Sequence, residues 1–328
     1  MSCPWGYSKC LNRHCEEPTG RAKCAPDDRL RDEAIHLPLR GEMDCFASLA
    51  MTESAEMLTK TPHLFDDATR VTAGDSRWQG KTSPDYWAFV GPFGGCTAAT
   101  ILRALIDHPQ RAGDPLSLTV NFCAPVAEGA FDLDVRLVKA NRSSQHWCVE
   151  MTQGGGEVAT LATAVFAERR PSWSHQQAAF PGAAPFEQAR RFPNTPMTWT
   201  HQYDFRFVEG EPSFYGSPAS SPLDAYSRQW IGDHVPRKID MLSLMSMSDA
   251  FFGRVFLARR ELIPFGTVSI TTYFHTSSDE LAADDITRVL AVADAKIFHR
   301  SYGDQHGELW SPSGRLLATT TQIAYFKA

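Results

Sequence analysis

The chain has 328 residues, of which 43% are hydrophobic and 21% charged, a composition typical of a globular protein large enough for two domains. Its net charge of −6 argues against the basic surface that nucleic-acid-binding proteins use. The longest apolar run, Tyr86 to Leu102, is broken by Pro92 and by glycines, so we expect no membrane span. The first residues lack the charged-then-apolar order of a secretory signal, which predicts a cytoplasmic protein.

Residues 1–56 show no sustained helical or strand period, and we expect a disordered or non-native extension there. The stretch LRGEMDCFASLAMT resembles translated bacterial intergenic repeat DNA, so Met51 or Met57 is the expected working start. The extension contains a cluster of zinc-ligand residue types whose C-x₄-C-x₈-C spacing lacks the short pairs of zinc sites: Cys10, His14, Cys15 and Cys24. We therefore expect reduced thiols and no metal.

Residues 57–171 are the expected N-terminal domain. The segment FGGCTAATILRALIDHP, from Phe93 to Pro109, has apolar residues at helical spacing and a Pro at its end, which predicts a helix. The strands expected after it are LSLTVNFCA, AFDLDVRLVKA, QHWCVEM and VATLATAVFA, with a QGGGE turn before the last.

Residues 200–328 repeat this plan and form the expected C-terminal domain. A helix is predicted over KIDMLSLMSMSDAFFGRVF, followed by the strands TVSITTYFH, ITRVLAVADAKIF, GELW and, after an SPSG turn, RLLATTTQIAYF. The closing hairpins of the two halves superpose at an offset of 159, which places Gly155 on Gly314 and Phe166 on Tyr325. Residues 172–199, rich in Pro and Ala, are the expected linker.

A helix followed by an antiparallel meander, present twice, predicts an α+β fold with two sheets that each wrap around one helix. The second helix is apolar on nearly all sides, which is typical of a helix buried within the protein. The chain therefore looks like a tandem double hotdog.

Three polar residues occupy apolar surroundings in the C-terminal half. Asp249 lies within the second predicted helix, where a buried carboxylate tends to acquire a raised pKa and a function, although Asp also favours helix bends and caps. Thr267 opens a strand and needs either the strand start or a bulge to point inward, but a lone threonine there is ordinary. Gln322 lies on a strand face of small and apolar residues, either as a satisfied core amide or as an active-site ligand.

Other motifs are not supported. GDSRWQGKT has five residues between its glycines, where a phosphate loop has four. No G-x-S-x-G nucleophile motif and no H-E-x-x-H metal motif is present.

Four short motifs resemble the acyl-CoA thioesterase II family of double-hotdog enzymes: FGGCTAATILRAL, MSD, GTVSITTYFH and LLATTTQ. The likeness extends over most of the chain after residue 60, and it implies that Asp249, Thr267 and Gln322 are catalytic. It also implies that Gly94 and Gly95 bind substrate, since glycine allows a close approach to the first helix. The residues after Thr267 are less polar than in the family, which leaves the substrate range open.

This resemblance implies an enzyme of cytoplasmic fatty-acid metabolism that hydrolyses acyl-CoA to a carboxylic acid and CoA without a cofactor, through a water held by Asp, Thr and Gln. Two alternatives remain open. The protein could bind acyl-CoA or another hydrophobic ligand without turnover, or act as a hydratase or dehydratase on acyl thioesters, although no Asp/His pair suited to that chemistry stands out. A homo-oligomer is compatible with these expectations, and the acyl chain length is not indicated.

Overall fold

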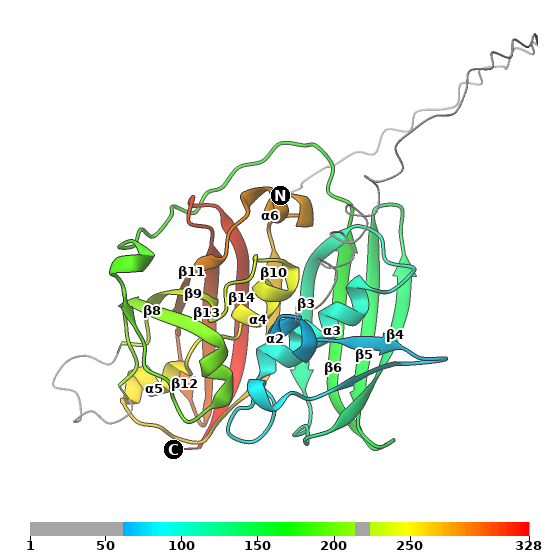
Figure 1. Ribbon diagram of the computed structural model, residues 1–328, viewed down its shortest axis with the longest axis horizontal. Coiled ribbons are helices and arrows are strands. Elements are labelled where there is room, and N and C mark those ends of the chain that lie inside the picture. Colours follow the sequence, from blue (N-terminus) through cyan, green and yellow to red (C-terminus); the bar gives the residue numbers. More distant parts are fainter. Residues whose placement is uncertain (1–61, 214–223, 328) are drawn as a thin grey trace, which may run out of the picture. The chain divides into compact units, whose positions relative to one another are not determined.

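The computed structural model describes residues 62–213 and 224–327, which belong to the compact unit Thr61–Ala328. The expected extension over residues 1–56, with its cysteine cluster, lies outside the described residues. Within them, fourteen strands form one antiparallel sheet that curves around the central helices (Figure 1).

The strands, in chain order, are β1 (Val71–Ala73), β2 (Trp78–Lys81), β3 (Asp114–Phe122), β4 (Ala130–Ala140), β5 (Ser144–Thr152), β6 (Val158–Ala167), β7 (Arg190–Arg191), β8 (Tyr203–Glu209), β9 (Ser227–Asp233), β10 (Phe265–Phe274), β11 (Arg288–Asp294), β12 (Phe298–His299), β13 (Tyr302–Trp310) and β14 (Leu316–Phe326). The helices are α2 (Leu64–Ala68), α3 (Gly94–Ile106), α4 (Met241–Met247), α5 (Arg254–Arg259) and α6 (Ser278–Asp284). Three 3₁₀ turns cover Pro84–Tyr86, Phe186–Gln188 and Thr198–Gln202.

The strand order shows two meanders joined edge to edge. The order is β1-β2-β4-β5-β6-β3-β10-β14-β13-β11-β9-β8-β7, and β12 pairs with β13. The junction is the antiparallel pair of β3 and β10, where Val120 lies opposite Ile270 and the hydroxyls of Thr119 and Thr271 are 2.9 Å apart. Each predicted strand is present, and the predicted α+β tandem hotdog is confirmed, although β1, β2, β7, β8 and β9 were not expected from the sequence.

The first predicted helix is confirmed as α3, but the second is wrong as a single helix. The structure has α4, a turn, and then α5, which begins after Gly253. The physical reason lies in the residues of the turn. The Ser248 hydroxyl donates to the Leu244 carbonyl at 2.7 Å, Ser and Asp compete with helical hydrogen bonding, and Gly favours a helix boundary. Asp249 is therefore in the turn that follows α4.

One continuous hydrophobic core lies between the sheet and the helices. It contains most of the apolar residues of α3 and α4 together with inward side chains of both meanders, including Trp147, Met151 and Phe166 from the N-terminal half. On β5, buried Trp147, Val149 and Met151 alternate with more exposed residues, as expected for a strand with one face in the core. The helices α3 and α4 pack against each other at the centre of this core (Figure 1).

The equivalence between the closing strands of the two halves needs a correction by one residue. At the predicted offset of 159, buried Phe166 would correspond to Tyr325, which is 42% exposed. An offset of 160 instead matches buried residues with buried residues, since Phe166 then corresponds to Phe326 and Thr160 to Thr320. Because strand side chains alternate between faces, only the second offset keeps the core face in register. It places Ala162 at the position of Gln322.

The segment that connects the halves has no helix or strand between Ala167 and Phe186, and it crosses from one half to the other (Figure 1). It packs against the C-terminal half, where the Trp230 indole donates to the Ala184 carbonyl at 2.9 Å and the Phe180 ring meets Trp310 edge to face. None of the helices in residues 62–213 and 224–327 is both long and apolar enough to cross a membrane.

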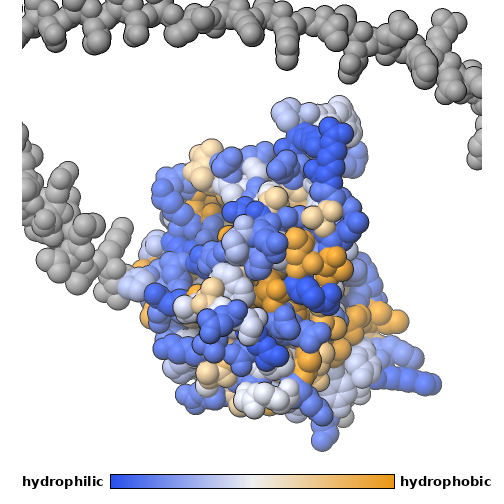
Figure 2. Space-filling model, turned by 90° about the vertical axis from the view of Figure 1, so that its right-hand side faces the viewer, coloured by the Kyte–Doolittle hydropathy of each residue, from blue (hydrophilic) through white to orange (hydrophobic). Residues whose placement is uncertain are grey.

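One side of the described unit carries a group of hydrophobic residues among hydrophilic ones. Figure 2 shows this face, which corresponds to the right-hand side of Figure 1, where β4 and β5 lie. Exposed apolar residues that are grouped in this way are typical of contact surfaces.

Candidate active site

Gln322 lies on the inward face of β14 and is 6% exposed. Its amide nitrogen donates to Oδ1 of Asp249 at 3.0 Å, and its amide oxygen accepts from the Thr267 hydroxyl at 3.1 Å. The three residues that the sequence singled out therefore form one continuous chain of hydrogen bonds. Both ends of the buried amide have partners, which removes the cost of about 1–3 kcal/mol for an unpaired buried polar group.

Thr267 reaches this chain because β10 is bulged. In the pairing with β14, Thr267 lies opposite Ala324, whereas Ser269 lies opposite Ile323, so Val268 is an extra residue. A bulge turns the side chain before it to the other face of the strand. Thr267 therefore lies on the inward face of β10, whereas regular alternation would place its side chain on the outer face.

Asp249 is 8% exposed and lies in the turn after α4. Ser248, and not Asp249, occupies the C-cap position of α4, so the aspartate does not serve as the local cap that its residue type allows. Besides Gln322, the backbone N–H of Gly95 at the start of α3 donates to its carboxylate. Burial raises the pKa of Asp249 from 3.8 to about 7, while the hydrogen bonds from Gln322 and Gly95 act in the opposite direction.

Gly94 and Gly95 bring the first helix against this carboxylate. A Cβ on Gly94 would lie 2.7 Å from Oδ2 of Asp249, and a Cβ on Gly95 would lie 2.4 Å from the Ser246 carbonyl oxygen. Neither distance is compatible with a larger residue in an unchanged backbone. The two glycines therefore allow α3 to approach α4 and the turn that contains Asp249. The sequence did not indicate this role of the glycines in helix packing.

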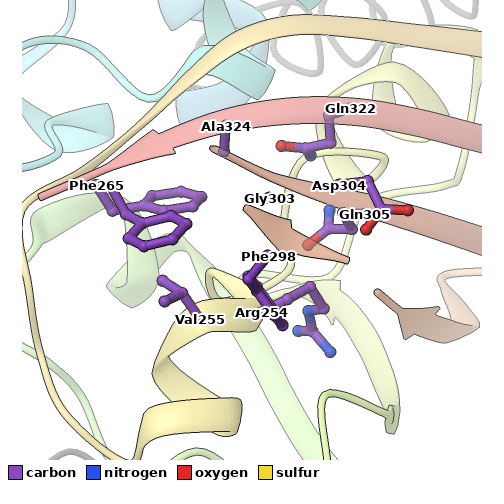
Figure 3. Close-up of a pocket in the computed structure, with 10 residues that line it drawn as sticks. Arg254, Val255, Phe265, Phe298, Gly303, Asp304, Gln305, Gln322 and Ala324 are labelled. Atoms are coloured by element: carbon purple, nitrogen blue, oxygen red, sulfur yellow. The ribbon is translucent and has the colours of Figure 1, made fainter. Parts of the chain in front are cut away.

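A pocket opens beside Gln322 in the C-terminal half (Figure 3). It has about 240 Å³ of empty space, including its open mouth, and its walls are mostly apolar. The lining residues are Arg254, Val255, Phe265, Phe298, Gly303, Asp304, Gln305, Gln322, Ala324 and Phe326. Gln305 was not singled out from the sequence, although it is an amide on an inward strand position like Gln322 and the same argument applies to it.

A second cavity of about 300 Å³ lies in the N-terminal half, lined by residues that include Tyr86, Cys96 and Met151. None of the three hydrogen-bonded residues lines it. At the position that corresponds to Gln322, this half has Ala162, which has no polar group to offer. The polar arrangement thus belongs to the C-terminal half.

Among the described residues, no group of His, Cys, Asp or Glu side chains could hold a metal ion, and Cys96, Cys123 and Cys148 are free thiols. The arrangement of Asp249, Gln322 and Thr267 instead suits a water molecule. A carboxylate with a pKa near 7 can accept a proton from water at neutral pH, and a neighbouring hydroxyl can orient that water. The Gly95 N–H brings the start of α3, the positive end of that helix, to the same carboxylate.

Comparisons with known proteins match both halves of the chain. The family model of the acyl-CoA thioesterase N-terminal domain matches residues 83–167, and that of the acyl-CoA thioesterase C-terminal domain matches residues 175–326. A conserved protein of unknown function with a hot dog fold from Alicyclobacillus acidocaldarius is 41% identical, with 82% of this chain and 99% of that chain covered and a TM-score of 0.77.

Two further solved structures show the same fold at lower identity. An acyl-CoA thioesterase II from Mycobacterium marinum is 19% identical over 80% of this chain and 98% of that chain, with a TM-score of 0.62. The tesB protein of Mycobacterium avium subs. paratuberculosis is 17% identical, with 80% of this chain and 98% of that chain covered and a TM-score of 0.63. Among curated proteins, none matches the chain.

Proposed function

The chain belongs to the acyl-CoA thioesterase family, and from this premise we propose that it hydrolyses acyl-CoA thioesters to a carboxylic acid and free CoA. The observation that carries the proposal is the hydrogen-bonded chain from Thr267 through Gln322 to the buried Asp249. Its three members come from β10, β14 and the turn after α4, so the fold of the C-terminal half assembles them.

In the proposed reaction, Asp249 takes a proton from a water molecule while the water oxygen attacks the thioester carbonyl carbon. The C–S bond of the resulting tetrahedral intermediate then breaks, and the proton held by Asp249 passes to the leaving thiolate. General-base catalysis of this kind contributes roughly 10²–10⁴ in rate. Gln322 holds the Asp249 carboxylate in place, and the Thr267 hydroxyl, which is partly exposed, orients the water.

Negative charge on the carbonyl oxygen of the intermediate needs donors. The start of α3 supplies backbone N–H groups next to Asp249, and Phe93 at its N-cap makes no side-chain bond to them. Donors of this kind, held in place before the reaction, are each worth roughly 10²–10³ in rate. In this proposal Gly94 and Gly95 contact the substrate through their backbone and leave room for its carbonyl group.

The experiment is a measurement of free CoA, detected with a thiol reagent, for saturated acyl-CoA esters from two to sixteen carbons, with a 2-enoyl-CoA and a 3-hydroxyacyl-CoA added as possible substrates of a hydratase or dehydratase. Stoichiometric release of CoA and carboxylic acid supports hydrolysis. A change in the acyl chain without CoA release indicates hydratase or dehydratase activity, and saturable binding without any product indicates a binding protein. Either of the last two results contradicts the proposal.

The cellular setting is part of the same proposal. We place the enzyme in cytoplasmic fatty-acid metabolism, and we propose that it forms a homo-oligomer, for which the exposed hydrophobic residues of Figure 2 are a suitable contact surface. Light scattering at several protein concentrations measures the assembly state directly.

A further inference from the structure

Phe122, at the end of β3, brings an aromatic ring of the N-terminal half into the candidate site. Its side chain shares the inward face of β3 with Leu118 and Val120 and packs against the core, although it is partly exposed. A Cβ on Gly94 would lie 3.1 Å from Cζ of Phe122 and 2.7 Å from Oδ2 of Asp249. Because both atoms lie so near one point, the ring and the carboxylate are close neighbours, and bulk water does not separate them.

The pairing of β3 on both sides holds Phe122 in this position. Phe122 lies opposite Thr160 of β6, and the next residue of the chain donates its N–H to the Ala159 carbonyl at 2.9 Å. On the other side, β3 pairs with β10 as far as Ser269, beside the bulge that turns Thr267 inward. Because the two strands are antiparallel, the Phe122 ring and the Thr267 hydroxyl flank the same end of the junction between the halves.

The surroundings of Asp249 in the described part of the chain are neutral. Its carboxylate accepts from the Gln322 amide and from the Gly95 N–H, and burial is the main cause of its raised pKa. The titratable side chains on neighbouring elements are Cys96 of α3 and Tyr203 of β8. Burial raises the pKa of both, so they stay neutral at neutral pH. The groups that exclude water from this carboxylate therefore control its strength as a base.

Phe122 combines an apolar ring with partial exposure, which suits it to exclude water from its neighbour. The Gln322 amide and the Thr267 hydroxyl are polar and bind water readily. Gly94 and Gly95 have no side chain with which to cover the carboxylate. A large apolar ring beside a buried carboxylate keeps water from that side, whereas a small polar side chain in its place would let water in.

We propose that Phe122 is a positioning residue for the hydrolysis, whose ring keeps water away from the Asp249 carboxylate except for the molecule that attacks the thioester. The inference rests on the proposed function and adds a side chain from the N-terminal half to it. A carboxylate with less hydration is a stronger base, and a stronger base takes a proton from water more readily. A small polar residue at position 122 therefore weakens the base and lowers the pH at which it ionises.

The test follows kcat/KM against pH in the wild type, Phe122→Ser and Phe122→Leu. Because the base must be ionised, kcat/KM falls below its pKa. We expect Phe122→Ser to move the midpoint of this fall downward by about one pH unit and to lower kcat at pH 8. Phe122→Leu, which keeps an apolar side chain, should move the midpoint less in the same direction, and it carries the test if the serine chain does not fold. The matched control is Phe180→Ser, since Phe180 is a partly buried ring that packs against Trp310, and the midpoint should stay unchanged.

A second measurement does not depend on activity and separates this inference from the function on which it rests. The stability gained through Asp249→Asn grows between pH 5 and pH 8 by an amount that reports the pKa of Asp249 in the folded chain, and we expect less growth when Phe122→Ser is present. If this growth and the midpoint stay unchanged in folded Phe122→Ser while KM alone changes, Phe122 only contacts the substrate, and the inference is wrong although hydrolysis stands. Near-normal turnover by Asp249→Asn overturns the proposed base and, with it, the positioning role of Phe122.

Discussion

Asp249, the proposed general base, lowers the stability of the fold when it is ionised. Burial raises its pKa to about 7, so between about pH 4 and 7 the folded protein keeps a proton that the unfolded chain has lost. The free energy of unfolding therefore falls as the pH rises through this range and is lowest above pH 7. The difference between 3.8 and about 7 corresponds to roughly 4 kcal/mol above pH 7.

Asp249→Asn should remove this pH dependence. The amide has no proton to lose, so we expect the variant to gain most over the wild type at pH 8, clearly less at pH 5, where the unfolded chain has already lost the proton, and least below about pH 4. Urea unfolding at these pH values measures the difference. Burial also raises the pKa of Asp233 to about 7, but this group is present in both proteins and its effect cancels. An equal stability difference at pH 5 and pH 8 would contradict the raised pKa.

Gln322→Leu tests whether the amide serves catalysis or only the core. A leucine fills a similar volume, and Asp249 can keep its proton when it loses the Gln322 donor, so we expect the free energy of unfolding at pH 7 to change by about 1 kcal/mol or less. Turnover should fall by about 10- to 1,000-fold. Because the Gln322 bond lowers the pKa of Asp249, the pH midpoint of kcat/KM should move upward. Lower stability with unchanged kcat per folded molecule would assign Gln322 to the core alone.

At the scale of secondary-structure elements, the contact between α3 and α4 positions Asp249. Gly95→Ala would put a methyl group 2.4 Å from the Ser246 carbonyl oxygen and force the two helices apart. We expect a loss of about 1–3 kcal/mol in stability together with lower kcat, because the turn after α4 moves with the helix. Gly266→Ala is the control, since its Cβ would meet nothing within 4 Å. Equal melting temperatures for the two variants would show that the close approach is not important.

The sequence predicted α3, α4 and the strands that carry the site because their patterns are local: apolar spacing, glycine turns and alternation. It placed Asp249 inside one long helix, because the apolar run continues through the turn and periodicity alone does not reveal the break before Gly253. The inward position of Gln322 followed from alternation, and the same rule left the strand start or a bulge as the two ways to turn Thr267 inward; the structure has the bulge. Phe122 was missed because its place beside Asp249 depends on packing between the two halves, which no local pattern records.

At the scale of the whole molecule, two halves with one plan have diverged into different roles. The N-terminal half contributes the start of α3, with Gly95 donating to Asp249, while Asp249, Thr267 and Gln322 all come from the C-terminal half. Ala162, at the place of Gln322, cannot support a second site. The proposed active centre therefore draws on both halves of the chain.

A chain that begins at Met51 should match the full chain in melting temperature and in CoA release, because the compact unit begins only at Thr61 and the site draws on residues after Gly94. Differential scanning fluorimetry and the thiol assay on both chains are sufficient. Loss of folding, or stability that depends on zinc in the full chain alone, would show that the extension is a genuine module.

Asp249, as the base that activates water, is the central residue of the proposed mechanism. The decisive measurement is steady-state CoA release at pH 8 by the wild type, Asp249→Asn and Asp233→Asn, where Asp233 is a buried carboxylate outside the hydrogen-bonded chain. We predict that kcat falls at least about a hundredfold in Asp249→Asn and changes little in Asp233→Asn, with both variants folded. Near-normal turnover by Asp249→Asn would contradict the account.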